Sequence, residues 1–135
     1  GGDIMYKDEH TTIEKFKELI KETFFNAKMA HDFLLENLYS SKKSSSSKSS
    51  SSRECEFISC ILLNNAISSY TCCRSFYYSN IEFLEDNRVD LFLHKFKTFS
   101  NEFLENVKTN HSHQWTNLTF EELKDQAETI LGDLT

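Results

Sequence analysis

An arginine and a histidine that could do chemistry together stand near the start of one amphipathic segment. Arg88 and His94 are separated by five residues. A histidine can serve in general acid/base catalysis, and an arginine can stabilise negative charge that develops on phosphate. On a helix with about 100° per residue the two side chains lie about 120° apart, with His94 facing away from the apolar ridge. A pair of solvated surface side chains is therefore the other interpretation.

In this motif, in its length and in its predicted helix count, the chain resembles the HEPN helical bundles. Ribonucleases of that family carry an arginine and a histidine, with four to six residues between them, near the start of a late helix. The resemblance implies a dimer that brings two such motifs together, with His94 in acid/base catalysis and Arg88 on phosphate. The family usually has a polar residue directly after the arginine, whereas this chain has Val89.

Two further groups of residues could bind a metal or form a disulfide. His111 and His113 lie in a polar segment without a neighbouring carboxylate, so we expect no metal site and no cofactor. Four cysteines fall in or beside one predicted helix: Cys55, Cys60, Cys72 and Cys73. Their spacing suits neither an intra-helix disulfide nor a CxxC zinc clamp. We expect small buried side chains in a reducing compartment, which indicates an intracellular protein, cytoplasmic or nuclear.

The composition indicates one aromatic-rich helical domain. The chain has 135 residues, with 12 phenylalanines, no proline, and glycine only at Gly1, Gly2 and Gly132. The interior of the sequence therefore lacks the usual signals of short strands and tight turns. We expect an all-α fold with a single core.

Acidic residues dominate everything except one low-complexity tract. Residues 40–52 consist only of serine and lysine, which predicts a flexible linker with no apolar side chain to bury. Its serines could accept phosphates, and an inert spacer is the other interpretation. All 21 acidic and 11 of the 15 basic residues lie outside 40–53, so the body of the chain should repel nucleic acid. No stretch approaches the roughly 20 apolar residues of a membrane span.

Hydrophobic periodicity predicts four helices. The first should begin at Thr11, in capping-box spacing with Glu14, and end near residue 38. The second, over about 55–78, is apolar nearly all round and is expected at the centre of the core. The third presents a ridge of apolar residues, most of them phenylalanine, between residues 89 and 107.

The fourth helix should begin at Thr119, which stands in capping-box spacing with Glu122. Short connections favour antiparallel neighbours, so we expect an up-and-down four-helix bundle with a long flexible Ser/Lys loop between its first two helices. The predicted organisation is a disordered segment over residues 1–10 and one helical domain over 11–135, with the linker 40–52 inside it.

Without a convergent polar site, the sequence favours a non-catalytic protein-interaction or self-association module. Phe25, Phe33 and Leu35 fall outside the main apolar stripe of the first helix and are the predicted binding residues. The partner would be another protein or a second copy of the chain. The alternatives are the HEPN-like ribonuclease and a secreted four-helix ligand with glycans on Asn110 and Asn117.

Overall fold

The computed structural model describes residues 8–43, 50–109 and 113–134, and side chains within 8–37, 53–109 and 113–134. Helices account for nearly all of this backbone, and it contains no strand. In chain order they are α1 (Glu9–Lys43), α2 (Ser50–Ser79), α3 (Ile81–Leu84), α4 (Asn87–Thr109) and α5 (His113–Leu131). The prediction of an all-α fold is confirmed, and α3 is a single turn that the sequence analysis treated as part of a loop.

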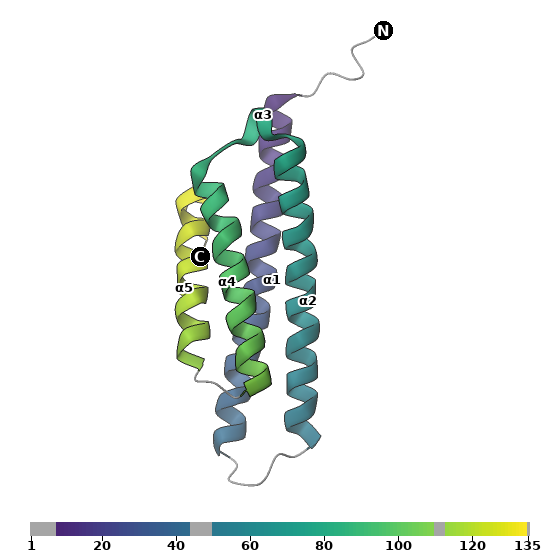
Figure 1. The fold of residues 1–135 in the computed structure, drawn as a ribbon, viewed down its shortest axis with the longest axis vertical. Helices are drawn as coiled ribbons and strands as arrows, with labels where there is room; N and C mark the ends of the chain where they lie inside the picture. The colour runs from purple at the N-terminus through teal and green to yellow at the C-terminus, as the bar shows by residue number, and fades with distance from the viewer. Residues whose placement is uncertain (1–7, 44–49, 110–112, 135) are drawn as a thin grey trace.

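The four long helices lie side by side along the length of the molecule (Figure 1). The most extensive packing joins α1 to α2 and α4 to α5, while α1 also contacts α5 and α2 contacts α4. Each long helix therefore has two neighbours and leaves one side to solvent.

Phenylalanine fills the core between these helices. The predicted ridge of α4 is buried at Val89, Phe92, Phe96, Phe99 and Phe103. Rings from other helices stack on it: Tyr70 of α2 lies 4.6 Å from Phe96 between centroids. Phe120 of α5 lies 5.8 Å from Phe99. These ring contacts hold α2, α4 and α5 around a common centre.

The start of α1 differs from the prediction because Asp8, directly before its first residue, caps it. Asp8 accepts hydrogen bonds from the His10 amide, at 3.2 Å, and from the Thr11 hydroxyl. The Thr11 hydroxyl is thus the donor to this cap, and α1 begins at Glu9. The expected capping box of Thr11 and Glu14 is wrong.

The start of α5 was also placed too late in the sequence. The helix begins at His113, six residues before the expected cap. Thr119 is buried inside the helix and its hydroxyl donates to the Thr116 carbonyl, at 3.0 Å. The helix ends at Leu131, and the next residue, Gly132, has φ 87°, a left-handed conformation that suits glycine after a helix.

Both helices beside the Ser/Lys tract extend into the range predicted as linker. Helix α1 continues to Lys43 and α2 begins at Ser50. The middle of the tract lies outside the described residues. At the other end, Glu9 and His10 of the expected disordered segment are helical.

The connection from α2 to α4 is held by one buried tyrosine. The Tyr77 hydroxyl accepts from the Asp86 amide, at 3.1 Å, and lies 2.9 Å from the Asp90 carboxylate. Asp86 in turn accepts from the Arg88 amide at 2.8 Å and so caps α4. None of the described helices is long and apolar enough to cross a membrane.

Candidate interaction surface

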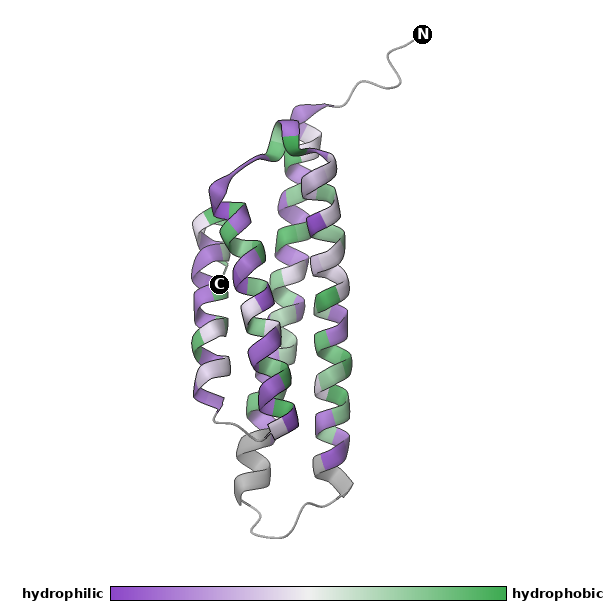
Figure 2. Cartoon of the chain, in the orientation of Figure 1, coloured by the Kyte–Doolittle hydropathy of each residue, from purple (hydrophilic) through white to green (hydrophobic). Residues whose placement is uncertain are grey.

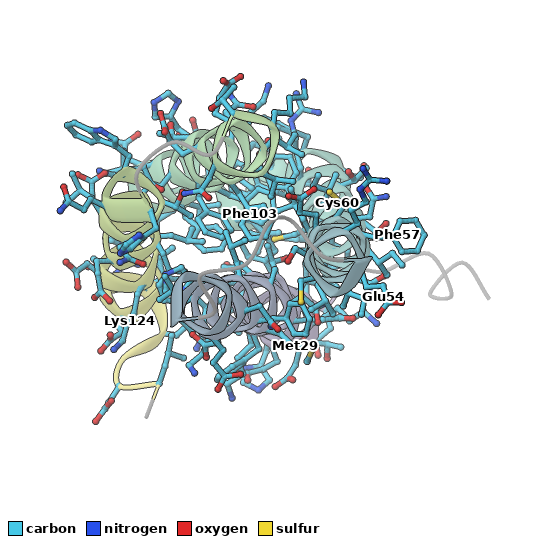
Figure 3. All side chains as sticks on the ribbon, turned by 90° about the horizontal axis from the view of Figure 1, so that it is seen from below. Met29, Glu54, Phe57, Cys60, Phe103 and Lys124 are labelled. Carbon is cyan, nitrogen blue, oxygen red and sulfur yellow. The ribbon has the colours of Figure 1, made fainter. Side chains whose placement is uncertain are left out.

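Helix α2 presents a row of exposed, uncharged side chains to solvent, which we call the α2 stripe. Its members are spaced by four and three residues in alternation, so they lie along one side of the helix. They are Phe57, Ile61, Asn64, Ser68, Thr71 and Ser75. Phe57 is 68% exposed and Ile61 is 44% exposed. Seen along the helices, Phe57 points away from the other helices, whereas Phe103 lies between them (Figure 3).

This surface contradicts the expectation that α2 would occupy the centre of the core. Its buried side consists of Ser59, Leu63, Ala66, Cys73 and Tyr77, and the opposite side is exposed. A helix at the corner of a bundle buries only the part that faces its neighbours. The apolar residues on the other side are therefore left in water.

The absence of charge distinguishes the exposed side of α2 from the rest of the surface. From Phe57 to Cys73 the sequence contains no acidic or basic residue. In Figure 2, α2 is mostly green or pale between its ends, while α4 and α5 carry many hydrophilic residues. An exposed apolar surface without charge is the kind that other proteins cover.

Two hydrogen bonds between α1 and α2 fix the orientation of this surface. The Asn26 side-chain amide donates to the Ser69 hydroxyl at 2.7 Å. The Cys55 thiol donates to the Asn37 side-chain oxygen at 3.0 Å. The helices are thus antiparallel, and interpolation between the two contacts places Phe33 level with roughly residue 60 of α2.

The apolar surface continues from α2 onto the edge of α1. Phe33 is half-buried and Met29, one turn earlier, is 56% exposed. At this level α2 contributes Ile58, which is 41% exposed, and Ile61. The candidate surface therefore consists of the α2 stripe together with Ile58 and the neighbouring edge of α1.

The three predicted binding residues do not form one surface. Phe25 is 40% exposed, while Phe33 and Leu35 are half-buried. Phe33 and Leu35 are two positions apart and so point about 160° away from one another around α1. Phe33 belongs to the α2 side of α1, and Leu35 points elsewhere.

Sequence reasoning missed Phe57, Ile58 and Ile61 because it assigned them to the core. The signal that could have found them is the spacing of Asn64, Ser68, Thr71 and Ser75, which continues the line of Phe57 and Ile61 with small or polar residues. A buried side of a helix seldom carries four such residues in succession.

The residues of the ribonuclease hypothesis are both at the surface of α4, but they are separate. The Arg88 guanidinium donates to the Asp86 carboxylate at 2.7 Å and to the Thr129 carbonyl at 3.3 Å. His94 has an exposed side chain. The two do not converge within one chain, so this hypothesis stays a prediction, to be tested by RNA cleavage that His94→Ala abolishes.

The cysteines are free thiols in different environments. Cys73 is buried, and burial raises the pKa of its thiol to about 12 despite a hydrogen bond with Thr23. Cys72 is exposed, while Cys55 and Cys60 are half-buried. The expectation of four buried side chains is therefore wrong for Cys72, and full burial holds only for Cys73.

The glycosylation motif of the secreted-ligand alternative overlaps a structural contact. Asn117 lies within α5, and its side-chain oxygen is 2.7 Å from Nε2 of the buried His31. His31 also stacks on Phe120, with 4.1 Å between ring centroids. A glycan, which would be attached to the side-chain nitrogen of Asn117, would therefore stand next to this contact between α1 and α5. Asn110 lies outside the described residues.

No group of side chains in the described ranges has the arrangement of a metal site. His113 starts α5, and His111 is not among the described residues. The expectation that these two histidines bind no metal therefore stays a prediction.

Comparison with known proteins assigns no family. The chain matched no protein-family model, no curated protein and no solved structure. The exposed surface of α2 is therefore the feature that points to a function.

Proposed function

We propose that this protein is a non-catalytic helical interaction module that binds a protein chain through the α2 stripe and Ile58. The architecture we infer is an up-and-down four-helix bundle, in which the Ser/Lys tract joins α1 to α2. The observation that carries the proposal is the exposure of Phe57 and Ile61 on a side of α2 that has no charged residue from Phe57 to Cys73.

Exposure of these residues has an energetic consequence. Burying a phenylalanine or isoleucine side chain gains about 1.5–3 kcal/mol relative to leaving it in water. Burial of Phe57, Ile58 and Ile61 by a partner would together contribute several kcal/mol of binding free energy, which is enough to anchor a moderate interface. The rest of the stripe is small or polar and would let a partner helix approach closely.

Other exposed apolar side chains do not form a comparable surface. Trp115 and Leu118 of α5 are 60% and 49% exposed, and the acidic Glu121 and Glu122 follow them within a turn. Leu91 of α4 is 43% exposed. Asp90 directly precedes it, and His94 follows it by three residues. Neither place has an uncharged surface along several helical turns.

The test compares substitutions of two side chains whose exposed fractions are nearly equal. Ile61→Asp puts a charge in the α2 stripe, and Leu91→Asp puts the same charge on α4, where the replaced side chain is 43% exposed. Tagged full-length protein is isolated from its native cells, and bound chains, including untagged copies of itself, are quantified by mass spectrometry.

We expect Ile61→Asp to lose the chains that wild type and Leu91→Asp retain at stoichiometric amounts. Equal recovery with both variants would contradict the proposal, provided that circular dichroism shows both to be folded. Complete absence of any stoichiometric chain from wild type would contradict it as well.

A further inference from the structure

We propose that a second copy of this chain covers the α2 stripe, with the two α2 helices antiparallel across a two-fold axis. This inference rests on the proposed function and names the partner. Its basis is the order of large, small and charged side chains along α2.

The α2 stripe has a bulky half and a small half. Phe57 and Ile61 lie in its first half, and Ser68, Thr71 and Ser75 in its second. Side chains at a close helix contact pack best when large residues meet small ones. The stripe is therefore complementary to itself only when one copy is reversed.

An antiparallel pairing brings every bulky residue against a small one. With the two-fold axis level with residue 66, Phe57 faces the partner's Ser75 and Ile61 faces the partner's Thr71. Asn64 then faces the partner's Ser68. The symmetry repeats each contact, giving six layers over about 27 Å of helix. A parallel pairing would set Phe57 against the partner's Phe57 and leave the serines facing one another.

The polar groups of the stripe can be buried in this pairing. The Thr71 hydroxyl already donates to the Ile67 carbonyl at 2.9 Å, so it needs no new partner. Asn64 and the partner's Ser68 offer an amide and a hydroxyl, which can donate and accept between them. A polar side chain at such a position fixes the register of paired helices.

The charges at the margins of the stripe favour the same pairing. Glu56 and Arg74 are 18 residues apart, which is five turns, so they lie on the same side of α2. Reversal brings Glu56 of each copy close to the partner's Arg74, at both ends of the interface. A parallel pairing would keep Glu56 and the partner's Arg74 at opposite ends of the interface, so they could not attract one another.

The acidic character of the whole chain makes this surface suitable for self-association. The formal net charge is −6, and the acidic residues lie outside the Ser/Lys tract. Two copies repel one another where acidic surfaces meet, and the uncharged stripe is where they can approach. Added salt screens the remaining repulsion, so it should strengthen the dimer, whereas it would weaken binding to a basic partner.

Sedimentation equilibrium of the full chain tests the pairing, with Asn64→Arg compared with Asn101→Arg. Both replaced residues are exposed asparagines within long helices, and Asn101 is on α4. We expect a reversible dimer at chain concentrations up to about 200 µM that does not weaken between about 0.05 and 0.5 M NaCl. Asn64→Arg should raise Kd by at least about tenfold and Asn101→Arg should leave it unchanged.

Disulfide trapping tests the direction of the helices. Asn64→Cys and Ser68→Cys are made separately, each with Cys72→Ser to remove the exposed thiol. Mild oxidation of the two variants mixed should give a linked dimer, and either variant alone should give little. Linkage by each variant alone would overturn the antiparallel arrangement.

A chain that stays monomeric in all salt conditions would overturn self-pairing. That result leaves the proposed function to its own test, because loss of a different protein by Ile61→Asp would still identify the α2 stripe as a binding surface. A dimer that Asn64→Arg and Asn101→Arg affect equally would also overturn the inference.

Discussion

At the scale of single residues, several buried hydroxyl groups form hydrogen bonds with carbonyls of their own helix. Thr23 donates to the Leu19 carbonyl at 2.8 Å, and Ser59 donates to the Cys55 carbonyl at 2.7 Å. A threonine inside a helix can thus find a hydrogen-bond partner for its hydroxyl, just as a threonine at a helix cap does. The capping-box pattern at Thr119 therefore predicted a helix start where the structure has a helix interior.

The cysteines give a residue-level prediction. Cys72 should react first with a thiol reagent because its side chain is exposed, and Cys73 should react only when the protein unfolds. Burial raises the Cys73 pKa to about 12, so its reactive thiolate is scarce in the folded protein even at pH 9. Mass spectrometry of peptides after timed alkylation measures both rates, and equal rates would contradict the described burial.

The contact between His31 and Asn117 predicts coupling between two substitutions. His31→Ala removes a buried stacked ring and leaves Asn117 without this partner, so we expect a loss of about 2–4 kcal/mol in the free energy of unfolding. Asn117→Ala should cost about 1 kcal/mol. In a double-mutant cycle by urea unfolding, the coupling should be about 0.5–1.5 kcal/mol. Additive effects would show that the link does not stabilise the fold.

At the scale of helices, α1 shows how far periodicity identifies burial. Steps of three and four residues predict an apolar stripe from Ile13 to Leu38. Its buried members are Phe16, Ile20, Phe24, Ala27, His31 and Leu34, while Ile13 is half-buried and the Leu38 side chain lies outside those described. Phe25 was predicted outside it and is 40% exposed. Three- and four-residue spacing specifies one side of a helix, and the neighbours of α1 lie on that side.

Adjacent phenylalanines in α1 provide a matched test of this assignment. Phe24 is 1% exposed, so Phe24→Ala should cost about 3–5 kcal/mol of unfolding free energy. Phe25→Ala should cost about 1 kcal/mol or less, since much of that ring is already in water. Chemical denaturation measures both, and a cost of several kcal/mol at Phe25 would make it part of the core.

The start of α4 allows a prediction of pH dependence. Hydrogen bonds from Arg88 lower the pKa of Asp86 below the ordinary value of an aspartate. A lowered pKa in the folded state contributes stability above about pH 4, and this contribution is lost as the pH falls further. Asp86→Ala should also remove the cap and cost about 1 kcal/mol at pH 7.

The measurement is urea unfolding of wild type, Asp86→Ala and a control, Asp125→Ala, at pH 7 and at pH 3. The exposed Asp125 is within α5. The difference in unfolding free energy between wild type and Asp86→Ala should be smaller at pH 3 than at pH 7, because the Asp86 carboxylate of wild type is then partly protonated. A gap that widened at pH 3 would contradict the role of Asp86.

At the scale of the whole molecule, the sequence predicted the all-α class and the core of α4 but not the surface. A helix with few charges suits either the centre of a core or an interface with another chain, and composition alone does not distinguish the two. Only the positions of α1 and α4 around α2 show which of its sides remains exposed. Phe57 and Ile61 were therefore assigned to the core, although they lie in solvent in the single chain.

The most direct test of the central claim is hydroxyl-radical footprinting of full-length protein isolated gently from its native cells. Ile61 and Leu91 have nearly equal exposure in the single chain, 44% and 43%. After normalisation to the unfolded chain, oxidation of Ile61 should be several-fold slower than that of Leu91, because a protein chain covers the α2 stripe. Equal oxidation of the two side chains would contradict the account.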